Sequence, residues 1–370
     1  MVGKENMIRV LPYTLSLLTP KRFGDANDFA SVSFRLDSFS MAPRIALDSS
    51  LPRRHRSTIF SSQSVRVADP LPSETPSAGR GGLPDPVFIN FNEFKKNLPQ
   101  FNAEHGKGKF VILLRHTISL FNRVSDLFNG DNDSPLIAEG YEQLKALTAT
   151  LKGFSIDEIL SSPLERALDP AFILRRDLGV VEPVRDIKDL VEMERGILSG
   201  RPKKLNAPEI DALFAKFDEQ SYRRMFQEKY HVTENEMDLV FTIARKRRAT
   251  LQMRAKAMGM SEDDYVSWVA EIENTLDGVP PDGDSFRQDE ERKRLLVELL
   301  FNNLKSGSHL VMGHGMTNRF LMLKMLEIPV ASVEQLLEIG QGYGAINVIW
   351  QAEGSDEWTL LVFNSDRDGN

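Results

Sequence analysis

The chain has 370 residues, 41% hydrophobic and 27% charged, which is enough for two or three domains or for one large domain with extensions. Its formal net charge of −7 argues against nucleic acid as the main partner. The absence of cysteine excludes disulfides, thiolate nucleophiles and thiolate metal sites. No segment reaches the roughly 18 uninterrupted apolar residues of a membrane helix, so we expect no membrane span.

Residues 1–85 differ in composition from the rest of the chain. They contain scattered Ser, Pro and Arg without a sustained helical or strand period, and 11 Lys and Arg stand against 8 Asp and Glu. This pattern is typical of a disordered extension. Organelle-targeting peptides are also rich in Arg and Ser, but they contain few acidic residues. We therefore expect a disordered extension on a cytoplasmic protein, with organelle targeting as the alternative.

From residue 86 onward, apolar strand patterns alternate with helical patterns. A helix over residues 91–98 and a strongly apolar strand over 109–114 (KFVILL) come first. The later segments, in chain order, are a helix from about 140 (YEQLKALTATL), a strand at 156–160, a helix at 164–178, a strand near 184–190, a helix at 296–305, a strand at 309–313, a helix at 318–326 and strands at 345–350 and 358–363. Strands that alternate with helices predict an α/β fold with a largely parallel sheet and helices on both faces.

The alternation stops between residues 201 and 281, where the pattern is helical throughout. We interpret this segment as a helical cap inserted into a catalytic domain that spans residues 86–370. The run Arg245-Lys246-Arg247-Arg248 lies on one of its predicted helices. Four consecutive helical residues point to all sides of a helix. The run is therefore either a solvated face or, in part, a contact for a second phosphate of a polyanionic substrate.

Two apolar strands end in a histidine. Residues 111–117 (VILLRHT) contain Arg115 and His116, and residues 309–315 (HLVMGHG) contain His314. Ligands bind at the carboxyl ends of the strands in open α/β sheets, so we expect both imidazoles at one electropositive pocket suited to phosphate. A neutral imidazole can attack phosphorus, and a guanidinium can hold two phosphate oxygens. The alternative for His314 is a buried histidine that bonds to backbone groups.

A further arginine follows the second predicted strand. Residues 161–167 (SSPLERA) place Arg166 in the first turn of a helix, where backbone N–H groups favour anions. Arg166 is therefore a candidate phosphate ligand, and a solvated helix arginine is the alternative.

A candidate general acid lies in the segment LVEMERGILSG. Glu192 is followed by Gly196 and Gly200 at spacings of four residues. A carboxylic acid near a bound phosphate can protonate the leaving oxygen and later take a proton from water. Glu194 is the rival for this role.

Taken in order, these motifs resemble the histidine phosphatase superfamily, in the branch of the cofactor-dependent phosphoglycerate mutases. The resemblance also includes Asn122, six residues after His116, and the run Gly283-Asp284-Ser285, and it covers about residues 108–350 without the cap. It implies a three-layer αβα fold and phosphoryl transfer through a phosphohistidine, with no metal or other cofactor. It implies that His116 is the nucleophile and Glu192 the proton donor. It also implies a phosphate pocket formed by Arg115, Asn122, Arg166 and His314. A protonated His314 would also stabilise charge that develops on the phosphoryl oxygens.

The chain departs from the pattern of this family at several positions. Thr117 and Ile118 stand where Gly-Glu usually follows the Arg-His pair, Asp284 replaces the usual Glu, and the Glu-Arg-His-Tyr-Gly-Gly run of glycolytic mutases is missing around Glu192. We therefore favour a phosphatase acting on a small phosphorylated substrate or a phosphoprotein. A phosphoryl mutase and an inactive phosphate-binding or scaffold protein are the alternatives. The sequence does not indicate the oligomeric state.

Two other chemistries are disfavoured. Residues 340–345 (GQGYGA) resemble a nucleotide-binding loop, but they precede a strand instead of following one. The sequence contains no HExxH or similar pattern of metal ligands, so we expect no metal-dependent hydrolysis.

Overall fold

The computed structural model describes residues 80–123, 130, 132–196, 219–230, 233–273, 275–366 and 368–369. The chain divides into two units, Met1–Asp69 and Pro70–Asn370, and all described residues belong to the second. Most of the predicted extension, residues 1–79, therefore lies outside the described residues. Its last part packs on the folded unit: Leu83 is buried in the hydrophobic core, and the side chain of Gln335 donates a hydrogen bond of 2.9 Å to the carbonyl of Gly81.

A six-stranded sheet in the order β3-β2-β4-β1-β5-β6 forms the centre of this unit. Strands β3, β2, β4 and β1 run parallel to one another, β5 is antiparallel to β1, and β6 is antiparallel to β5. The strands are β1 (Gly108–Arg115), β2 (Glu158–Ser161), β3 (Arg185–Asp186), β4 (Gly307–Gly313), β5 (Ile346–Ala352) and β6 (Trp358–Ser365). The sheet is mostly parallel, as the alternation of strands and helices predicted.

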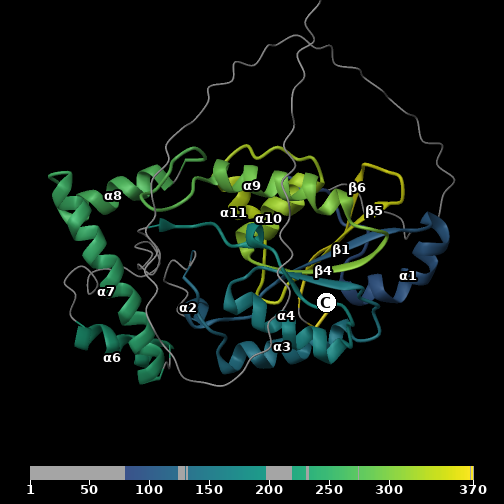
Figure 1. Ribbon diagram of the computed structural model, residues 1–370, viewed down its shortest axis with the longest axis horizontal. Helices are drawn as coiled ribbons and strands as arrows, with labels where there is room; N and C mark the ends of the chain where they lie inside the picture. Colours follow the sequence, from purple (N-terminus) through teal and green to yellow (C-terminus); the bar gives the residue numbers. More distant parts are fainter. Residues whose placement is uncertain are drawn as a thin grey trace, which may run out of the picture. The chain divides into compact units, whose positions relative to one another are not determined.

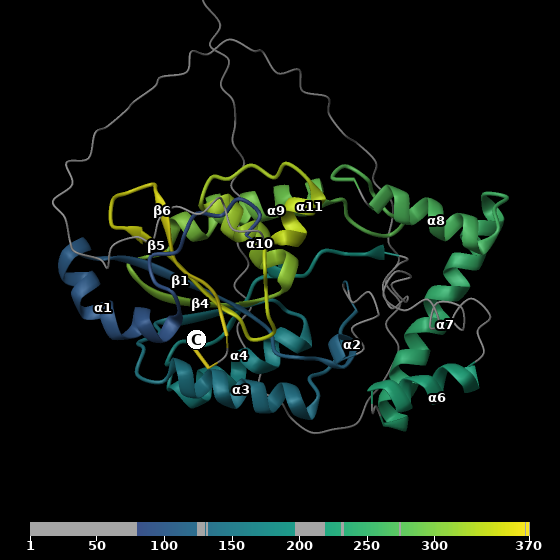
Figure 2. The same ribbon diagram turned by 180° about the vertical axis from the view of Figure 1, so that it is seen from behind.

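Helices cover both faces of the sheet, so the fold is a three-layer αβα sandwich. In both views α3 and α4 lie on one side of the sheet, and α9, α10 and α11 lie on the other (Figures 1 and 2). The helices of the layers are α1 (Phe91–His105), α2 (Leu120–Arg123), α3 (Ala138–Leu151), α4 (Glu165–Leu178), α9 (Phe286–Leu299), α10 (Gly315–Met325) and α11 (Val333–Glu338), with short 3-10 turns at Lys188–Leu190 and Phe301–Asn303.

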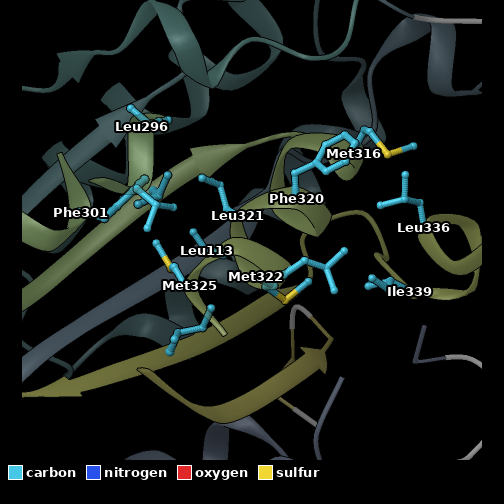
Figure 3. Close-up of a cluster of buried hydrophobic side chains, with 14 of the residues drawn as sticks. Leu113, Leu296, Phe301, Met316, Phe320, Leu321, Met322, Met325, Leu336 and Ile339 are labelled. Carbon is cyan, nitrogen blue, oxygen red and sulfur yellow. The ribbon is translucent and has the colours of Figure 1, made fainter. Parts of the chain in front are cut away.

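The alternation of side chains along the strands explains the two hydrophobic cores. Val111 and Leu113 of β1 belong to the cluster on the side of α9 and α10, while Ile112 and Leu114 belong to the cluster on the side of α3 and α4. Successive strand residues point to opposite faces, so an uninterrupted apolar run is what a sheet covered on both faces requires. Figure 3 shows side chains of the first cluster gathered around Leu113. Each fully buried aliphatic side chain contributes about 1.5–3 kcal/mol to stability.

Among the predicted elements, three differ most from the sequence prediction. Helix α1 continues through Pro99, because Phe101 beyond it is still buried in the core. Helix α9 begins ten residues earlier than expected, since Ser285 forms a capping box with Gln288: its Oγ accepts from the backbone N–H at 3.1 Å, and its own N–H donates to Oε1 at 2.8 Å. The predicted strand at 184–190 is reduced to the two exposed residues of β3 and a 3-10 turn.

The described part of the predicted cap is helical. It consists of α6 (Glu219–Tyr230), α7 (Glu234–Ala257) and α8 (Glu262–Glu273). Helices α7 and α8 share a small core in which Leu251 and Ala255 pack against Tyr265 and Val269. Among the described helices, none is long and apolar enough to cross a lipid bilayer.

Candidate active site

His116 and His314 directly follow two neighbouring parallel strands. The register of β1 and β4 pairs Arg115 with Gly313, and the N–H of His116 donates to the carbonyl of Gly313 at 3.0 Å. The next residue of each strand is therefore the histidine. Their rings meet edge to face with centroids 5.1 Å apart. The structure thus brings the two imidazoles together at the carboxyl edge of the sheet, where the sequence predicted a phosphate pocket.

The contact of His116 with its neighbour determines which ring nitrogen is free. Its Nδ1 lies 2.7 Å from the carbonyl oxygen of Thr117. A carbonyl oxygen can only accept, so Nδ1 carries the hydrogen and Nε2 keeps a lone pair in the neutral ring. Burial, and then the charges of Arg166 and Arg115, hold the pKa of His116 well below its ordinary value of 6.5. The imidazole of His116 is therefore neutral at pH 7, and its Nε2 keeps the lone pair that a nucleophile needs.

His314 is held from a third strand. Its Nε2 lies 2.7 Å from the hydroxyl oxygen of Ser162, and the N–H of Ser162 in turn donates to the carbonyl of Met312 at 2.9 Å. Burial, followed by the charges of Arg166 and His116, lowers the pKa of His314 well below 6.5. Within the described part of the chain its buried Nδ1 has no hydrogen-bond partner. A neutral His314 next to a cationic pocket is therefore able to gain a proton when an anion enters.

Arg166 lies in the first turn of α4, the helix that follows β2. Its side chain is only 1% exposed, and its Nη1 and Nη2 donate to the carbonyls of Asn132 at 2.6 Å and Gly130 at 2.9 Å. These carbonyls fix the orientation of the guanidinium. After burial, the charge of Arg166 is the next largest cause that lowers the pKa of both imidazoles.

Arg115 is clamped by the segment that precedes β5. Its Nη1 donates to the carbonyl of Gln341, and its guanidinium carbon lies 3.9 Å from the centroid of the Tyr343 ring. That ring is also 6.3 Å from the ring of His116. Because β5 runs antiparallel to β1, the start of β5 lies at the same edge as the end of β1. The segment 340–345 is therefore a wall of the site, although it precedes a strand.

Glu192 lies at the first turn of α10, the helix that follows His314. Its Oε2 accepts from the N–H of Met316 at 3.3 Å, and its Oε1 accepts from the N–H of Met193 at 3.0 Å. The loop then turns at Gly196, whose φ of +52° is in the left-handed region. A side chain there would come within 2.1 Å of the carbonyl of Pro281, which explains the glycine.

Sequence comparison agrees with this geometry. The profile of the histidine phosphatase superfamily (branch 1) matches residues 111–249, a stretch that contains His116, Arg166 and Glu192. Over this stretch the chain is similar to the histidine phosphatase superfamily.

A curated relative within this superfamily is the adenosylcobalamin/α-ribazole phosphatase of Escherichia coli. It is 38% identical over 81 residues, which are 22% of this chain and 38% of the length of that enzyme. Among solved structures, the α-ribazole phosphatase of Shigella flexneri aligns with a TM-score of 0.46 at 21% identity, over 69% of this chain and 96% of its own. A mycobacterial glucosyl-3-phosphoglycerate phosphatase aligns with a TM-score of 0.46 at 20% identity, over 70% of this chain and 100% of its own.

The positions at which this chain departs from the superfamily pattern are built into the fold. Thr117 is fully buried, and it is not among the described residues with positive φ, so its backbone needs no glycine. Ile118 donates its N–H to the side chain of Gln143 at 3.0 Å. Asp284 pairs with Arg292 at 2.7 Å. The Gly-Asp-Ser run thus shapes the start of α9.

Asn122 and Glu194 form hydrogen bonds that the sequence did not predict. The buried Asn122 accepts hydrogen bonds at its Oδ1 from the N–H of Ser119 at 3.3 Å and from its hydroxyl at 2.8 Å. The carbonyl of Glu194 accepts from the N–H of Asp284 at 3.0 Å. The carboxylate of Glu192 contacts the helix that follows His314, which supports Glu192 as the candidate proton donor.

Several residues of the site carried no role in the sequence prediction. Ser162 lies inside the motif SSPLERA, so its position after a strand was a usable signal. No sequence signal pointed to Tyr343 or Arg319. Arg319 donates its Nε–H to the carbonyl of Ile339 at 2.8 Å, and burial, followed by the charge of Arg115, lowers its pKa to about 10. Among the described residues, no group of three or more His, Asp or Glu is arranged to hold a metal ion.

Proposed function

We propose that the chain is a phosphatase that hydrolyses phosphomonoesters through a phosphohistidine on His116, without a metal ion. The single observation that carries the proposal is the pair of buried imidazoles with ring centroids 5.1 Å apart, whose pKa values are lowered by burial and by the charges of Arg166 and Arg115. The match of residues 111–249 to the histidine phosphatase superfamily and the phosphatase name of the curated relative support it. A small phosphorylated metabolite or a phosphoprotein is the substrate class.

The reaction proceeds in two displacements. In the first, the Nε2 lone pair of His116 attacks phosphorus, the phosphorus–oxygen ester bond breaks, and Glu192 gives its proton to the leaving oxygen. In the second, a water molecule attacks the phosphohistidine, the carboxylate of Glu192 takes the proton from that water, and the phosphorus–nitrogen bond breaks. Inorganic phosphate leaves and the neutral imidazole returns.

The positive groups of the pocket stabilise charge on the transferred phosphoryl group. The guanidiniums of Arg115 and Arg166 are anchored on backbone carbonyls, so they are oriented before substrate arrives. His314 takes up a proton as the anion enters and adds a third cationic donor. Donors that are fixed in advance in a site without water are the most effective form of electrostatic catalysis.

The test is phosphate release from 4-nitrophenyl phosphate by the full chain in the presence of a chelator. The variant His116→Ala should lose on the order of 10³-fold or more in kcat/KM, since removal of a nucleophile abolishes the covalent route. His309→Ala is the matched control. His309 is buried in β4, the strand that directly precedes His314, but it pairs with Glu158 at 2.8 Å. It should keep wild-type turnover.

Two results would reject the proposal. Equal rates for wild type and His116→Ala would indicate an inactive phosphate-binding protein. A product that retains its phosphate at a new position, formed only with a bisphosphorylated primer, would instead identify a mutase.

A further inference from the structure

A buried lysine that takes no part in the proposed reaction holds the loop before Glu192. Lys293 of α9 has a fully buried side chain. Its Nζ donates to the carbonyls of Asp189 at 2.7 Å and Val191 at 2.9 Å, and lies 3.1 Å from Oδ1 of Asp289. An ammonium group has three N–H donors, and these three acceptors use all of them.

A second side chain holds the same loop from α10. The hydroxyl of Thr317 donates to the carbonyl of Val191 at 2.8 Å. Glu192 follows directly, and its carboxylate accepts from the N–H of Met316 at 3.3 Å. The residue before the acid is thus tied to both α9 and α10, and the acid itself is tied to α10.

An ammonium group in this position needs an explanation beyond packing. Burial of a charge is unfavourable unless it is paired and fully hydrogen-bonded. Burial lowers the pKa of Lys293, and the charge of Asp289 opposes that effect. The nearby positions Leu296 and Val297 of the same helix are filled by apolar side chains. What distinguishes Lys293 is that it donates hydrogen bonds to two backbone carbonyls of one loop, a pair of contacts that we call the grip.

We infer that Lys293 is a positioning residue, which sets the place from which Glu192 delivers its proton by holding the carbonyls of Asp189 and Val191. The inference rests on the proposed function and deepens it. The nucleophile and the arginines belong to β1 and α4, so this grip does not hold them. The charge of Lys293 also lowers the pKa of His314, after burial and the charges of Arg166 and His116. Loss of Lys293 should therefore slow esters whose leaving oxygen needs a proton, and hardly affect esters with a good leaving group.

The experiment compares Lys293→Met with wild type on alkyl phosphates (glycerol phosphate and phosphoserine) and on 4-nitrophenyl phosphate. We expect kcat for the alkyl esters to fall by on the order of 100-fold, as for a small misplacement of a reacting group. For the aryl ester, kcat should fall by less than about threefold, since its leaving group needs little protonation. Inhibition by vanadate should keep its wild-type constant, because vanadate binding does not require the acid.

Lys109→Met is the matched control. Lys109 is also a buried lysine that donates to two backbone carbonyls, those of Phe301 at 3.0 Å and Asn302 at 2.7 Å. It lies at the start of β1, at the opposite edge of the sheet from His116. Its loss should lower stability and leave the ratio of alkyl to aryl turnover unchanged.

Equal slowing of both ester classes by Lys293→Met, or the same change of ratio in Lys109→Met, would overturn the inference and leave a purely structural lysine. If Lys293→Met does not fold, Thr317→Val removes only the second bond to Val191. This variant should change the ratio in the same direction by roughly fivefold, the effect of one lost hydrogen bond of about 1 kcal/mol. An unchanged ratio in Thr317→Val would then count against the grip.

Failure of the proposed function has a different signature. A wild-type chain that releases phosphate from no ester fails as a phosphatase, and the grip is then tested by amide hydrogen exchange of residues 189–193. Exchange there should be faster in Lys293→Met than in both wild type and Lys109→Met. Exchange at the wild-type rate would overturn the inference without any reference to turnover.

Discussion

The guanidinium of Arg115 lies 3.9 Å from the centre of the Tyr343 ring, and that ring is 6.3 Å from the ring of His116. The carbonyl of Gln341 holds the same guanidinium from a second direction. An arginine that is stacked and hydrogen-bonded keeps one orientation, so part of the ordering needed to bind phosphate is complete in the free protein. Tyr343 is therefore expected to act on phosphate binding through Arg115.

Replacement of Tyr343 tests this stacking. Tyr343→Ala should lower kcat/KM by about 3- to 30-fold, which corresponds to a cation–π contact of about 0.5–2 kcal/mol. Tyr343→Phe keeps the ring and should stay within about twofold of wild type. The measurement is kcat/KM for 4-nitrophenyl phosphate. A loss in Tyr343→Phe as large as in Tyr343→Ala would show that the hydroxyl group, and not the ring, is needed.

The two histidines could be placed from sequence because strand direction was the only structural assumption required. VILLRH and HLVMGH are apolar strands with a helix between and after them, and parallel strands of one sheet end at one edge. Arg166 could be placed for the same reason, since it follows β2. The fold class was predictable from the alternation of strands and helices, and the structure confirms it.

Tyr343 and Lys293 could not be found in this way, for two physical reasons. The apolar run of β5 has the same pattern in a parallel and in an antiparallel strand, and only the antiparallel direction brings residues 340–345 to the site. Lys293 stands in the charged run ERKR, which is typical of a solvated helix face. Its burial follows from the packing of α9 against the loop before Glu192, which no local pattern encodes.

Substitution of the proposed acid tests the assignment between the two glutamates. Glu192→Gln should slow alkyl phosphates by about 100-fold or more and 4-nitrophenyl phosphate by less than about tenfold, because good leaving groups need little protonation. The measurement is kcat for each ester class. Glu194→Gln is the matched control and should leave the ratio of the two rates unchanged. A changed ratio in Glu194→Gln alone would transfer the role to Glu194.

Thr117 tests whether the departure from the family glycine obstructs the pocket. Its side chain is fully buried, and its hydroxyl has no hydrogen-bond partner within the described part of the chain. Because its φ is not positive, Thr117→Gly should lower stability by about 1 kcal/mol through backbone entropy. Turnover of 4-nitrophenyl phosphate should stay within about threefold of wild type.

Urea unfolding and steady-state rates of Thr117→Gly check both expectations. Thr117→Ser, which keeps the hydroxyl and removes the methyl group, separates the two parts of the side chain. A rise in kcat of tenfold or more, about 1.4 kcal/mol of barrier, in Thr117→Gly would show that threonine hinders phosphoryl transfer.

The two buried histidines also make stability depend on pH. In the folded chain burial, and then the charge of Arg166, hold both pKa values well below 6.5, whereas in the unfolded chain both return to about 6.5. Below that pH the unfolded state binds protons that the folded state does not bind. The stabilising contribution is therefore complete above about pH 6.5 and is lost as the pH falls toward the folded pKa values.

Each histidine contributes a slope of at most about 1.4 kcal/mol per pH unit. Urea unfolding of wild type and His314→Gln between pH 5 and pH 8 measures the contribution of His314, and the values at pH 8 give the effect of the substitution that does not depend on pH. The free energy of unfolding of wild type minus that of His314→Gln should decrease as the pH falls from 6.5 to 5. A difference that stays constant over this range would show that His314 keeps its ordinary affinity for a proton in the folded chain.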